Sequence, residues 1–338
     1  MKDSHRNALM AAGIAAGTAA AAAGFSAFSK IRYGRSAQAS VLAGALRAFA
    51  GRGVLLGKDL GRFEDFVEAC RQENEVEYHI PSWLRLRSLV FEETCDGMKT
   101  FHLGTTGKNA RAVLYLHGGA YVKQISWVHW LFLDDLCQRT GAEVFVPIYP
   151  LAPAHDHDEA YSLLTDLYEG MLRRYEAKDV TLMGDSAGGG LAAGLAESFS
   201  HYDLEQPGQL VLLSPQLDIT MRNPQIHDYF DVDPALAPWG LAQLGDLWAD
   251  GDDVTDYRLS PINGDVRPLR NVTTFVATRE IFYPDCVAFD AKLGENGVSH
   301  ELVVGTGQAH IWPLYPTPEG RKARRLIEQL VTKEVPRG

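Results

Sequence analysis

The stretch that decides the fold is Val180–Gly188, with the sequence VTLMGDSAG. Its last five residues fit the pattern G-x-S-x-G, which places a serine on a tight turn between a strand and a helix. The apolar run before the turn predicts the strand, and residues 188–199 have helical periodicity. A plain glycine-rich turn is the alternative, but the strand–turn–helix context favours Ser186 as a nucleophile whose hydroxyl stands clear of the backbone.

A second glycine-rich turn, His117-Gly118-Gly119-Ala120, directly follows the predicted strand Ala112–Leu116. Its flexible backbone can aim the N–H groups of Gly118 and Gly119 at one point, where the N–H of Ala187 joins them. These three groups are candidate donors of an oxyanion hole, which holds the negative charge that develops on an attacked carbonyl oxygen. We expect His117 to be structural, because the base of such a site follows the serine in the chain.

The remaining partners are expected near the C-terminus, in the order serine, acid, histidine. His310 follows the last predicted strand, Glu301–Val304, and is the candidate general base; a surface loop histidine is the alternative. Two carboxylates compete for the role of the acid. Glu280 comes just after the predicted strand Thr273–Ala277, whereas Asp285 lies in the first turn of the next helix, where it complements the helix dipole. We favour Glu280 as the group that orients His310, and Asp285 stays open.

From about residue 111 onward, short apolar runs alternate with longer amphipathic stretches. This alternation predicts a mostly parallel sheet with helices on both faces, which is an α/β fold. A hairpin around Cys95-Asp96-Gly97 is expected to precede it. The predicted strands are Leu86–Glu92, Met98–Leu103, Ala112–Leu116, Glu143–Ile148, Val180–Met183, Leu210–Leu213, Thr273–Ala277 and Glu301–Val304. The predicted helices are Trp127–Arg139, Asp158–Tyr175, Gly188–Phe199, Pro284–Glu295 and Pro318–Leu330.

Two stretches interrupt this alternation. Residues 36–80 predict helices before the sheet, and residues 218–257 form an insertion that carries aromatic side chains among many acidic ones. Both are expected to form a cap over the active-site edge of the sheet, which shapes the substrate pocket and excludes water. We therefore predict an alanine-rich N-terminal segment over residues 1–35 and a catalytic domain with this cap over residues 36–338.

The N-terminal segment is unusual, because residues 8–29 carry no charge and are dominated by alanine and glycine. The run is long enough to cross a bilayer, and Gly13 and Gly17 form the G-x-x-x-G pattern of packed membrane helices. Alanine is only weakly apolar, so a signal peptide cleaved near residues 20–23 and a tail outside the core are open as well. The sequence predicts a membrane-associated or cytoplasmic protein in preference to a secreted one.

The composition is that of a globular protein, with 46% hydrophobic and 22% charged residues among 338. The formal net charge of −11 and the lack of a basic stripe disfavour binding to nucleic acid, so we predict no nucleic-acid partner. No two of the four cysteines form a C-x-x-C pair, so neither a zinc site nor a disulfide framework is indicated. We expect buried free thiols at Cys70, Cys95, Cys137 and Cys286.

Two clusters carry the residue types of metal sites. The first, His155-Asp156-His157-Asp158-Glu159, precedes a predicted helix, and acidic residues are typical of a first helical turn. The second, Asp250-Gly251-Asp252-Asp253, is expected to be a solvated turn rather than a calcium loop. We predict no metal at either cluster.

Taken together, the two glycine motifs resemble those of hormone-sensitive-lipase-like esterases, within the α/β-hydrolase superfamily. Three further segments are similar to family motifs: Tyr149–His155 to Y-R-L-A-P-E-H, Ser214–Asp218 to S-P-W-x-D, and Thr278–Ile281 to the strand end that bears the acid. The resemblance extends from about residue 111 to the C-terminus and, more loosely, over the cap. Pro150 replaces the usual arginine, and Glu280 replaces the usual aspartate.

The resemblance implies an α/β-hydrolase fold with a helical cap, and an esterase for small to medium acyl esters that needs no metal or organic cofactor. It implies that Ser186 is the nucleophile, His310 the base and Glu280 the acid, with oxyanion donors at Gly118, Gly119 and Ala187. Two other functions stay open. One is a ligand-binding protein on the same scaffold, as in the plant gibberellin receptors, which lack the catalytic histidine. The other is an acyltransferase with the same triad.

Overall fold

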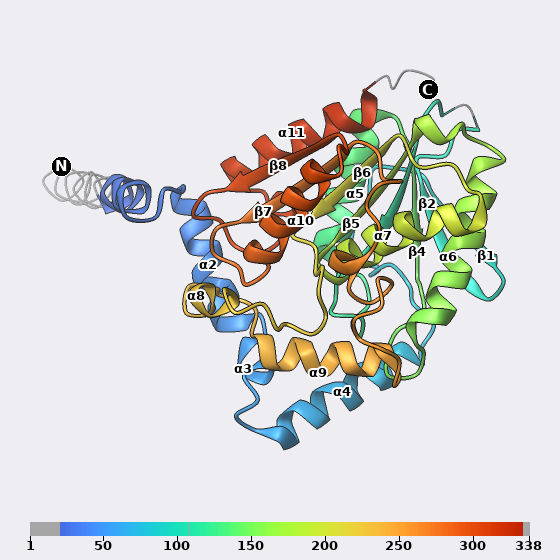
Figure 1. The fold of residues 1–338 in the computed structure, drawn as a ribbon. Coiled ribbons are helices and arrows are strands. Elements are labelled where there is room, and N and C mark those ends of the chain that lie inside the picture. Colours follow the sequence, from blue (N-terminus) through green and yellow to red (C-terminus); the bar gives the residue numbers. More distant parts are fainter. Residues whose placement is uncertain (1–20, 108, 334–338) are drawn as a thin grey trace, which may run out of the picture.

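The computed structural model describes residues 21–107 and 109–333 (Figure 1). Its centre is an eight-stranded sheet in the order β1-β2-β4-β3-β5-β6-β7-β8. β1 pairs with β2 and β2 with β4 in antiparallel fashion, and all other neighbours are parallel. The strands are β1 (Val90–Cys95), β2 (Met98–Leu103), β3 (Ala112–Leu116), β4 (Glu143–Pro147), β5 (Val180–Asp185), β6 (Gln209–Leu213), β7 (Val272–Ala277) and β8 (His300–Gly305).

Helices cover both faces of this sheet, as predicted for an α/β fold. On one face lie α5 (Trp127–Thr140) and α11 (Pro318–Thr332). On the other lie α6 (His157–Leu172), α7 (Ser186–Ser198) and α10 (Tyr283–Glu295). Short 3₁₀ turns are η1 (Ala177–Asp179), η2 (Phe199–Tyr202), η3 (Pro261–Asn263) and η4 (Trp312–Leu314).

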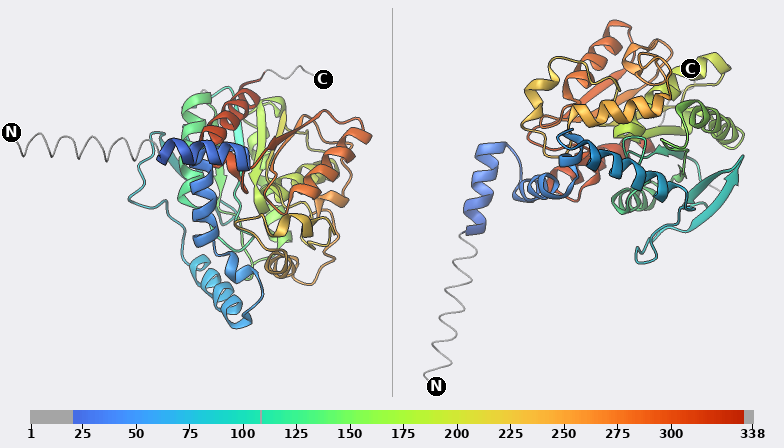
Figure 2. Two further views of the ribbon diagram at one scale, coloured as in Figure 1. Left: turned by 90° about the vertical axis from the view of Figure 1, so that its left-hand side faces the viewer. Right: turned by 90° about the horizontal axis from the view of Figure 1, so that it is seen from below.

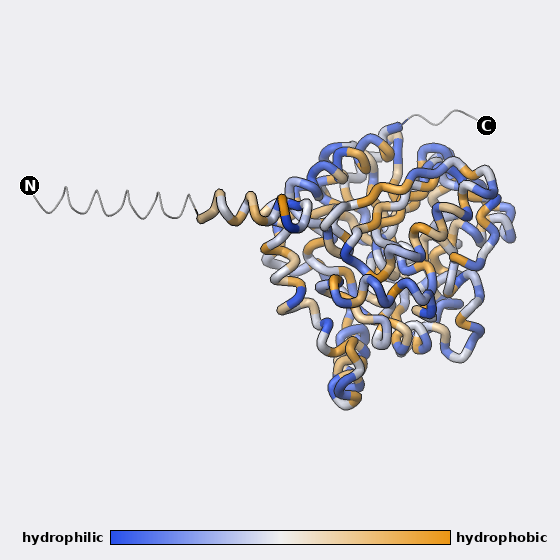
Figure 3. The backbone as a smooth tube through the Cα atoms, turned by 60° about the vertical axis from the view of Figure 1, so that its left-hand side comes forward, coloured by the Kyte–Doolittle hydropathy of each residue, from blue (hydrophilic) through white to orange (hydrophobic). Residues whose placement is uncertain are grey.

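The central strands β3 to β7 are buried at every position and mostly apolar, because both of their faces are covered. In β3, the side chains of Ala112, Leu114 and Leu116 join the core under α6 and α7, whereas Val113 and Tyr115 join the core under α5 and α11. The tube coloured by hydropathy shows such apolar segments running through the body of the molecule (Figure 3). A continuous apolar run therefore predicts a buried parallel strand here.

The six predicted parallel strands are all present, with ends displaced by two residues at most. The first hairpin strand was predicted to begin at Leu86, but β1 begins at Val90. The reason is a tertiary contact. Asp134 of α5 accepts the N–H groups of Arg87 (3.0 Å) and Ser88 (2.8 Å), so this segment is bonded to a helix and not to β2.

Five further helices come from the two stretches predicted to form the cap. They are α2 (Ala37–Phe49), α3 (Arg52–Leu55), α4 (Leu60–Asn74), α8 (Ile226–Phe230) and α9 (Pro238–Ala249). Figures 1 and 2 show α3, α4 and α9 together at one end of the sheet. Gly240 of α9 lies against Leu55 of α3 so closely that a β-carbon there would be 2.6 Å from the Leu55 Cα. The two stretches thus meet, while the domain boundaries at residues 35 and 36 stay a prediction.

The N-terminal helices are fixed to the body of the domain by Arg35 and Ser36. The Arg35 guanidinium donates to the carbonyl of Gly307 (2.8 Å), and Ser36 donates to the Glu319 carboxylate through its N–H (2.6 Å) and its hydroxyl (2.8 Å). Most of the predicted membrane segment, residues 8–29, lies outside the described residues, and residues 21–29 are helical. Within the described part, no helix has the length and apolar character that crossing a bilayer requires.

Candidate active site

Ser186 lies at the sharp turn from β5 into α7. Its φ of 55° is in the left-handed region, which is strained for a residue with a side chain. The turn is tight enough that a β-carbon at Gly184 would lie 2.1 Å from the carbonyl oxygen of Gly188. α7 begins at Ser186 itself, two residues before the predicted start. The positive end of the helix dipole therefore lies at the serine, where it would stabilise a negative charge.

Ser186, His310 and Glu280 form one hydrogen-bonded chain. The Nε2 atom of His310 lies 2.9 Å from the Ser186 Oγ, and its Nδ1 atom lies 2.5 Å from a carboxylate oxygen of Glu280. The three residues follow β5, β8 and β7, whose carboxyl ends share one edge of the sheet. With Glu280 ionised, the ring holds its proton on Nδ1, so Nε2 is free to accept the serine proton.

The chain also fixes the protonation of His310. Burial lowers the pKa of His310, but the hydrogen bond and the negative charge of Glu280 outweigh burial, so the net pKa lies above the ordinary value of 6.5. The protonated form of His310 is therefore stabilised inside the protein.

Glu280 is held in place through its second oxygen. The Ser214 hydroxyl donates to that oxygen (2.8 Å), and so does the N–H of Ala277 (2.5 Å). Ser214 in turn accepts the N–H of Ile311, the residue after His310 (3.0 Å). Sequence reasoning missed this serine as a positioning residue, although it opens the segment Ser214–Asp218 that resembles a family motif.

The alternative acid, Asp285, is bonded elsewhere. It is buried and accepts a hydrogen bond from the Asn223 amide (2.7 Å), and burial raises its pKa to about 6. The structure therefore brings Glu280, and not Asp285, to His310.

A second buried carboxylate that the sequence did not single out is Asp233. It accepts the N–H groups of Ala235 (2.7 Å) and Leu236 (2.8 Å), and that of Ile281, next to Glu280 (2.9 Å). Burial raises the pKa of Asp233 to about 6. When Asp233 is charged, it adds to the stabilisation of protonated His310.

The first glycine turn departs from the prediction at Gly118. Its N–H donates to the Asp185 carboxylate (2.9 Å), which also accepts from the Tyr115 hydroxyl (2.6 Å) and faces the His129 Nε2 (3.2 Å). The predicted oxyanion role of Gly118 is therefore corrected, because its donor is already used. The N–H groups of Gly119 and Ala120, which both line the cavity over Ser186, have no acceptor in the part of the chain that the structure describes.

His117 has the contacts of a structural residue, as expected. Its Nδ1 lies 2.9 Å from the Gly118 carbonyl, and its ring stacks on Tyr149 with centroids 4.6 Å apart. The Tyr149 hydroxyl donates to the His117 carbonyl (2.6 Å). Burial lowers the pKa of His117 to about 4, so it is neutral at physiological pH.

A cavity of about 680 Å³ lies over Ser186 and His310. Its floor comes from the two glycine turns, and its roof from helices of both cap stretches. The apolar residues of the roof are Leu46, Ala50, Val54, Leu55, Phe66, Leu241 and Leu244. The segments that interrupt the strand–helix alternation therefore shape the space in which a substrate would bind.

The two clusters with metal-ligand residue types meet in space. His157 Nε2 lies 3.6 Å from Asp158 and 3.5 Å from Asp252, so these three side chains are near enough to share a cation. Arg258 already forms an ion pair with Asp158, and this fixed cation opposes a metal ion at that place. Of the other members of the first cluster, His155 bonds to Glu159 and Asp156 caps α6.

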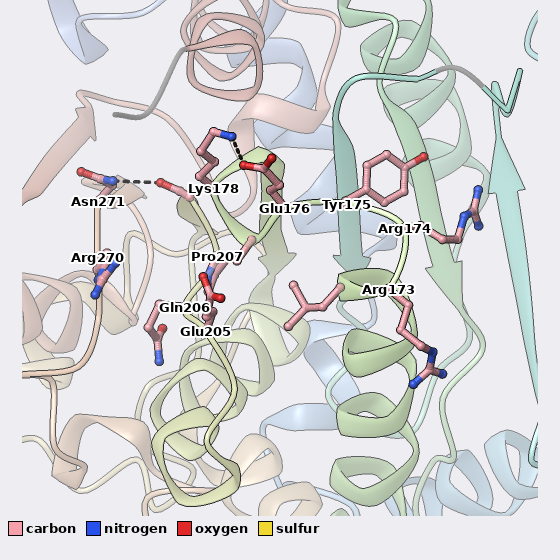
Figure 4. A pocket seen from close by; sticks show the side chains of 13 residues that line it. Arg173, Arg174, Tyr175, Glu176, Lys178, Glu205, Gln206, Pro207, Arg270 and Asn271 are labelled. Carbon is pink, nitrogen blue, oxygen red and sulfur yellow. Dashed lines mark hydrogen bonds and ion pairs between the residues drawn. The ribbon is translucent and has the colours of Figure 1, made fainter. Parts of the chain in front are cut away.

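A polar hollow of about 620 Å³ lies at the amino ends of β5, β6 and β7 (Figure 4). There Lys178 is paired with Glu176, and the Asn271 amide donates to the Gly208 carbonyl (2.9 Å). None of the candidate catalytic residues lines this hollow, so the candidate site is at the opposite edge of the sheet.

Comparisons with known proteins identify the fold and the class of protein. The family model of the alpha/beta hydrolase fold matches residues 113–314. An esterase of Acinetobacter venetianus is 27% identical over 241 residues, which cover 70% of this chain and 79% of that protein. The carboxylesterase/phospholipase LipF of Mycobacterium tuberculosis is 31% identical over 232 residues, which are 65% of this chain and 61% of LipF.

A crystal structure of a Staphylococcus aureus protein assigned as an esterase superposes with a TM-score of 0.80 at 29% identity, over 83% of this chain and 96% of that one. The fold and the site thus define an α/β-hydrolase. The chain belongs to this family, and its two glycine motifs resemble those of the hormone-sensitive-lipase-like esterases.

Proposed function

We propose that this protein hydrolyses carboxylic esters with Ser186 as nucleophile, His310 as general base and Glu280 as the acid that orients it. The observation that carries the proposal is the hydrogen-bonded chain from Ser186, which lines the cavity, through the buried His310 to the buried Glu280. Retention of this chain argues against a merely ligand-binding protein on the same scaffold.

In the first step, the Ser186 Oγ attacks the ester carbonyl carbon while its proton passes to the Nε2 of His310. The carbonyl oxygen gains negative charge and accepts from the N–H groups of Gly119, Ala120 and Ala187. The tetrahedral intermediate then expels the alcohol, which takes the proton from His310, and leaves an acyl group on Ser186. Water repeats the sequence on the acyl-enzyme and releases the acid.

The catalytic cavity by itself has room for small to medium acyl groups. Its volume of about 680 Å³ lies within the range of small-molecule pockets, and its roof is apolar. The names of the relatives, esterase and carboxylesterase/phospholipase, support an ester as the substrate.

The proposal is tested with p-nitrophenyl esters of increasing acyl length, and with Ser186→Ala as the control. We expect turnover by the wild-type protein and a loss of several orders of magnitude in the variant. No turnover of any ester by folded wild-type protein would favour the ligand-binding alternative. Product analysis with an added alcohol separates hydrolysis from acyl transfer.

A further inference from the structure

A second cavity, of about 880 Å³, lies next to the catalytic one. We call it the α2–α5 groove, because it is lined by residues of α2, of α5 and of the chain around Leu314–Pro316. Four residues line both cavities, namely Leu46, Ala50, Trp127 and Tyr315. The two spaces are therefore direct neighbours, and the groove leads away from the serine along α2.

The walls of the groove are suited to hydrocarbon. Leu42, Ala45, Val128, Leu131 and Leu314 supply apolar surface. Most charged residues of the wall pair with one another. Arg87 pairs with Asp134 (3.0 Å) and Asp135 (3.2 Å), and Arg324 lies 3.9 Å from Asp135. Arg85 adds an exposed cation at the wall.

Large apolar side chains are also exposed around the groove. Trp127 and Leu131 are 49% and 41% exposed, and Trp83, whose ring centroid lies 6.3 Å from that of Trp127, is 64% exposed. Large apolar side chains that are exposed next to one another often mark a binding surface, whereas single exposed ones are common. They suit an apolar ligand that reaches the groove from outside.

We propose that the α2–α5 groove binds the long hydrocarbon chain of the ester substrate, which extends from the catalytic cavity past Leu46 and Trp127. The physiological substrate class is then a lipid ester with a chain too long for the catalytic cavity alone. This inference rests on the proposed ester hydrolysis and extends it from the reacting bond to the substrate. The chain belongs either to the acyl part or to the alcohol part of the ester.

The proposal is tested with a pair of tryptophan substitutions on α2. Ala45 is exposed and lines the groove but not the catalytic cavity, so Ala45→Trp fills the groove alone. Ala48 is exposed on the same helix and lines neither cavity, so Ala48→Trp is the matched control. The readout is kcat/KM on p-nitrophenyl esters from acetate to palmitate, and on acetates of alcohols of increasing length.

For wild-type protein we expect kcat/KM to rise along one of the two series beyond the medium-chain members, by up to about fourfold for each buried methylene. Ala45→Trp should keep the rates on acetate and butyrate within about twofold and lose about tenfold or more on the long-chain members of that series. Ala48→Trp should match the wild type throughout. The series that responds identifies the part of the ester that carries the chain.

The proposal is overturned if Ala45→Trp and Ala48→Trp have the same chain-length profile, or if the wild type prefers short chains in both series. Either result leaves ester hydrolysis itself intact, because the short esters report it separately. If Ala45→Trp does not fold, Leu131→Asp takes its place. This change puts a charge into the groove wall at a half-exposed position outside the catalytic cavity, and the same selective loss on long chains is expected.

Discussion

His310 and His117 are both buried at the catalytic edge of the sheet, yet they are tuned in opposite directions. The pKa of His310 is raised, because hydrogen bonding and charge from Glu280 exceed the effect of burial. The pKa of His117 falls to about 4, because burial dominates and its bonded neighbour is the uncharged carbonyl of Gly118. Burial alone therefore does not decide how a histidine titrates.

The difference shows that the hydrogen-bond partner of a buried histidine decides whether the ring can act as a base or is only structural. A carboxylate behind the ring gives a base that can hold a proton for part of the reaction cycle. A carbonyl behind the ring leaves the histidine neutral and structural. In this protein that histidine is His117, which packs the first glycine turn against Tyr149. The predictions below test this contrast, from the largest effect to the smallest.

The contrast is tested most strongly by changing each histidine to asparagine. His310→Asn removes the proposed base, and kcat/KM should fall by about 10⁴-fold or more. His117→Asn keeps a donor near the Gly118 carbonyl, so its kcat/KM should stay within about tenfold of the wild type. Steady-state kinetics on a short ester measures both. Comparable losses in two variants that fold equally well would contradict the assignment of roles.

Removing the charge behind His310 should make it titrate more like His117. In the wild type, His310 must be neutral to act, so activity should rise with pH through a midpoint above 6.5. Glu280→Gln should lower kcat by about 10³-fold or more. It should also move that midpoint to lower pH, since burial then acts without an opposing charge. The measurement is the pH profile of kcat/KM, and Asp285→Asn is the control, with its midpoint unchanged.

The role of Asp185 in holding the first glycine turn predicts a smaller effect. Asp185→Ala leaves the Gly118 N–H and the Tyr115 hydroxyl without their acceptor, so the oxyanion donors should shift. We expect kcat to fall by about 10²-fold, of the order of losing one oxyanion donor. Asp185→Asn retains an acceptor oxygen and should lose less. If both variants keep wild-type kcat, Asp185 does not position this turn.

The smallest effect concerns Glu197, a buried carboxyl on α7 with no hydrogen-bond partner within the described residues. Burial raises its pKa well above 4.5, so the folded state holds this proton more tightly than the unfolded state. Its contribution to stability is full below about pH 4.5 and is lost as pH rises through the folded-state pKa. Glu197→Gln should therefore lose less unfolding free energy than the wild type between pH 5 and 8, measured by urea denaturation. An identical pH dependence would count against the burial effect.

Much of the fold could be predicted from the sequence, because a strand that is buried on both faces has a continuous apolar sequence. The strand Ala112–Leu116 is such a run, and its predicted bounds match β3. The prediction failed at Leu86 because the neighbouring Arg87 and Ser88 bond to Asp134, a contact between elements far apart in the chain. Strand periodicity contains no information on such a partner.

Some features of the site could be predicted from the sequence and others could not. Ser186, His310 and Glu280 could be placed from motif and chain order, since each follows a predicted strand. The use of the Gly118 donor and the positioning role of Ser214 could not, because both depend on side chains brought together by folding. The α2–α5 groove also depends on how helices pack, which the sequence pattern does not describe.

The most direct test of the account is covalent labelling of Ser186 by an alkyl fluorophosphonate, followed by intact mass and peptide mapping. We predict one adduct per chain, on Ser186, formed rapidly by the wild type and by His117→Asn and far more slowly by His310→Asn. Labelling at another residue, no labelling of folded protein, or a rate that depends on His117 and not on His310 would contradict the account.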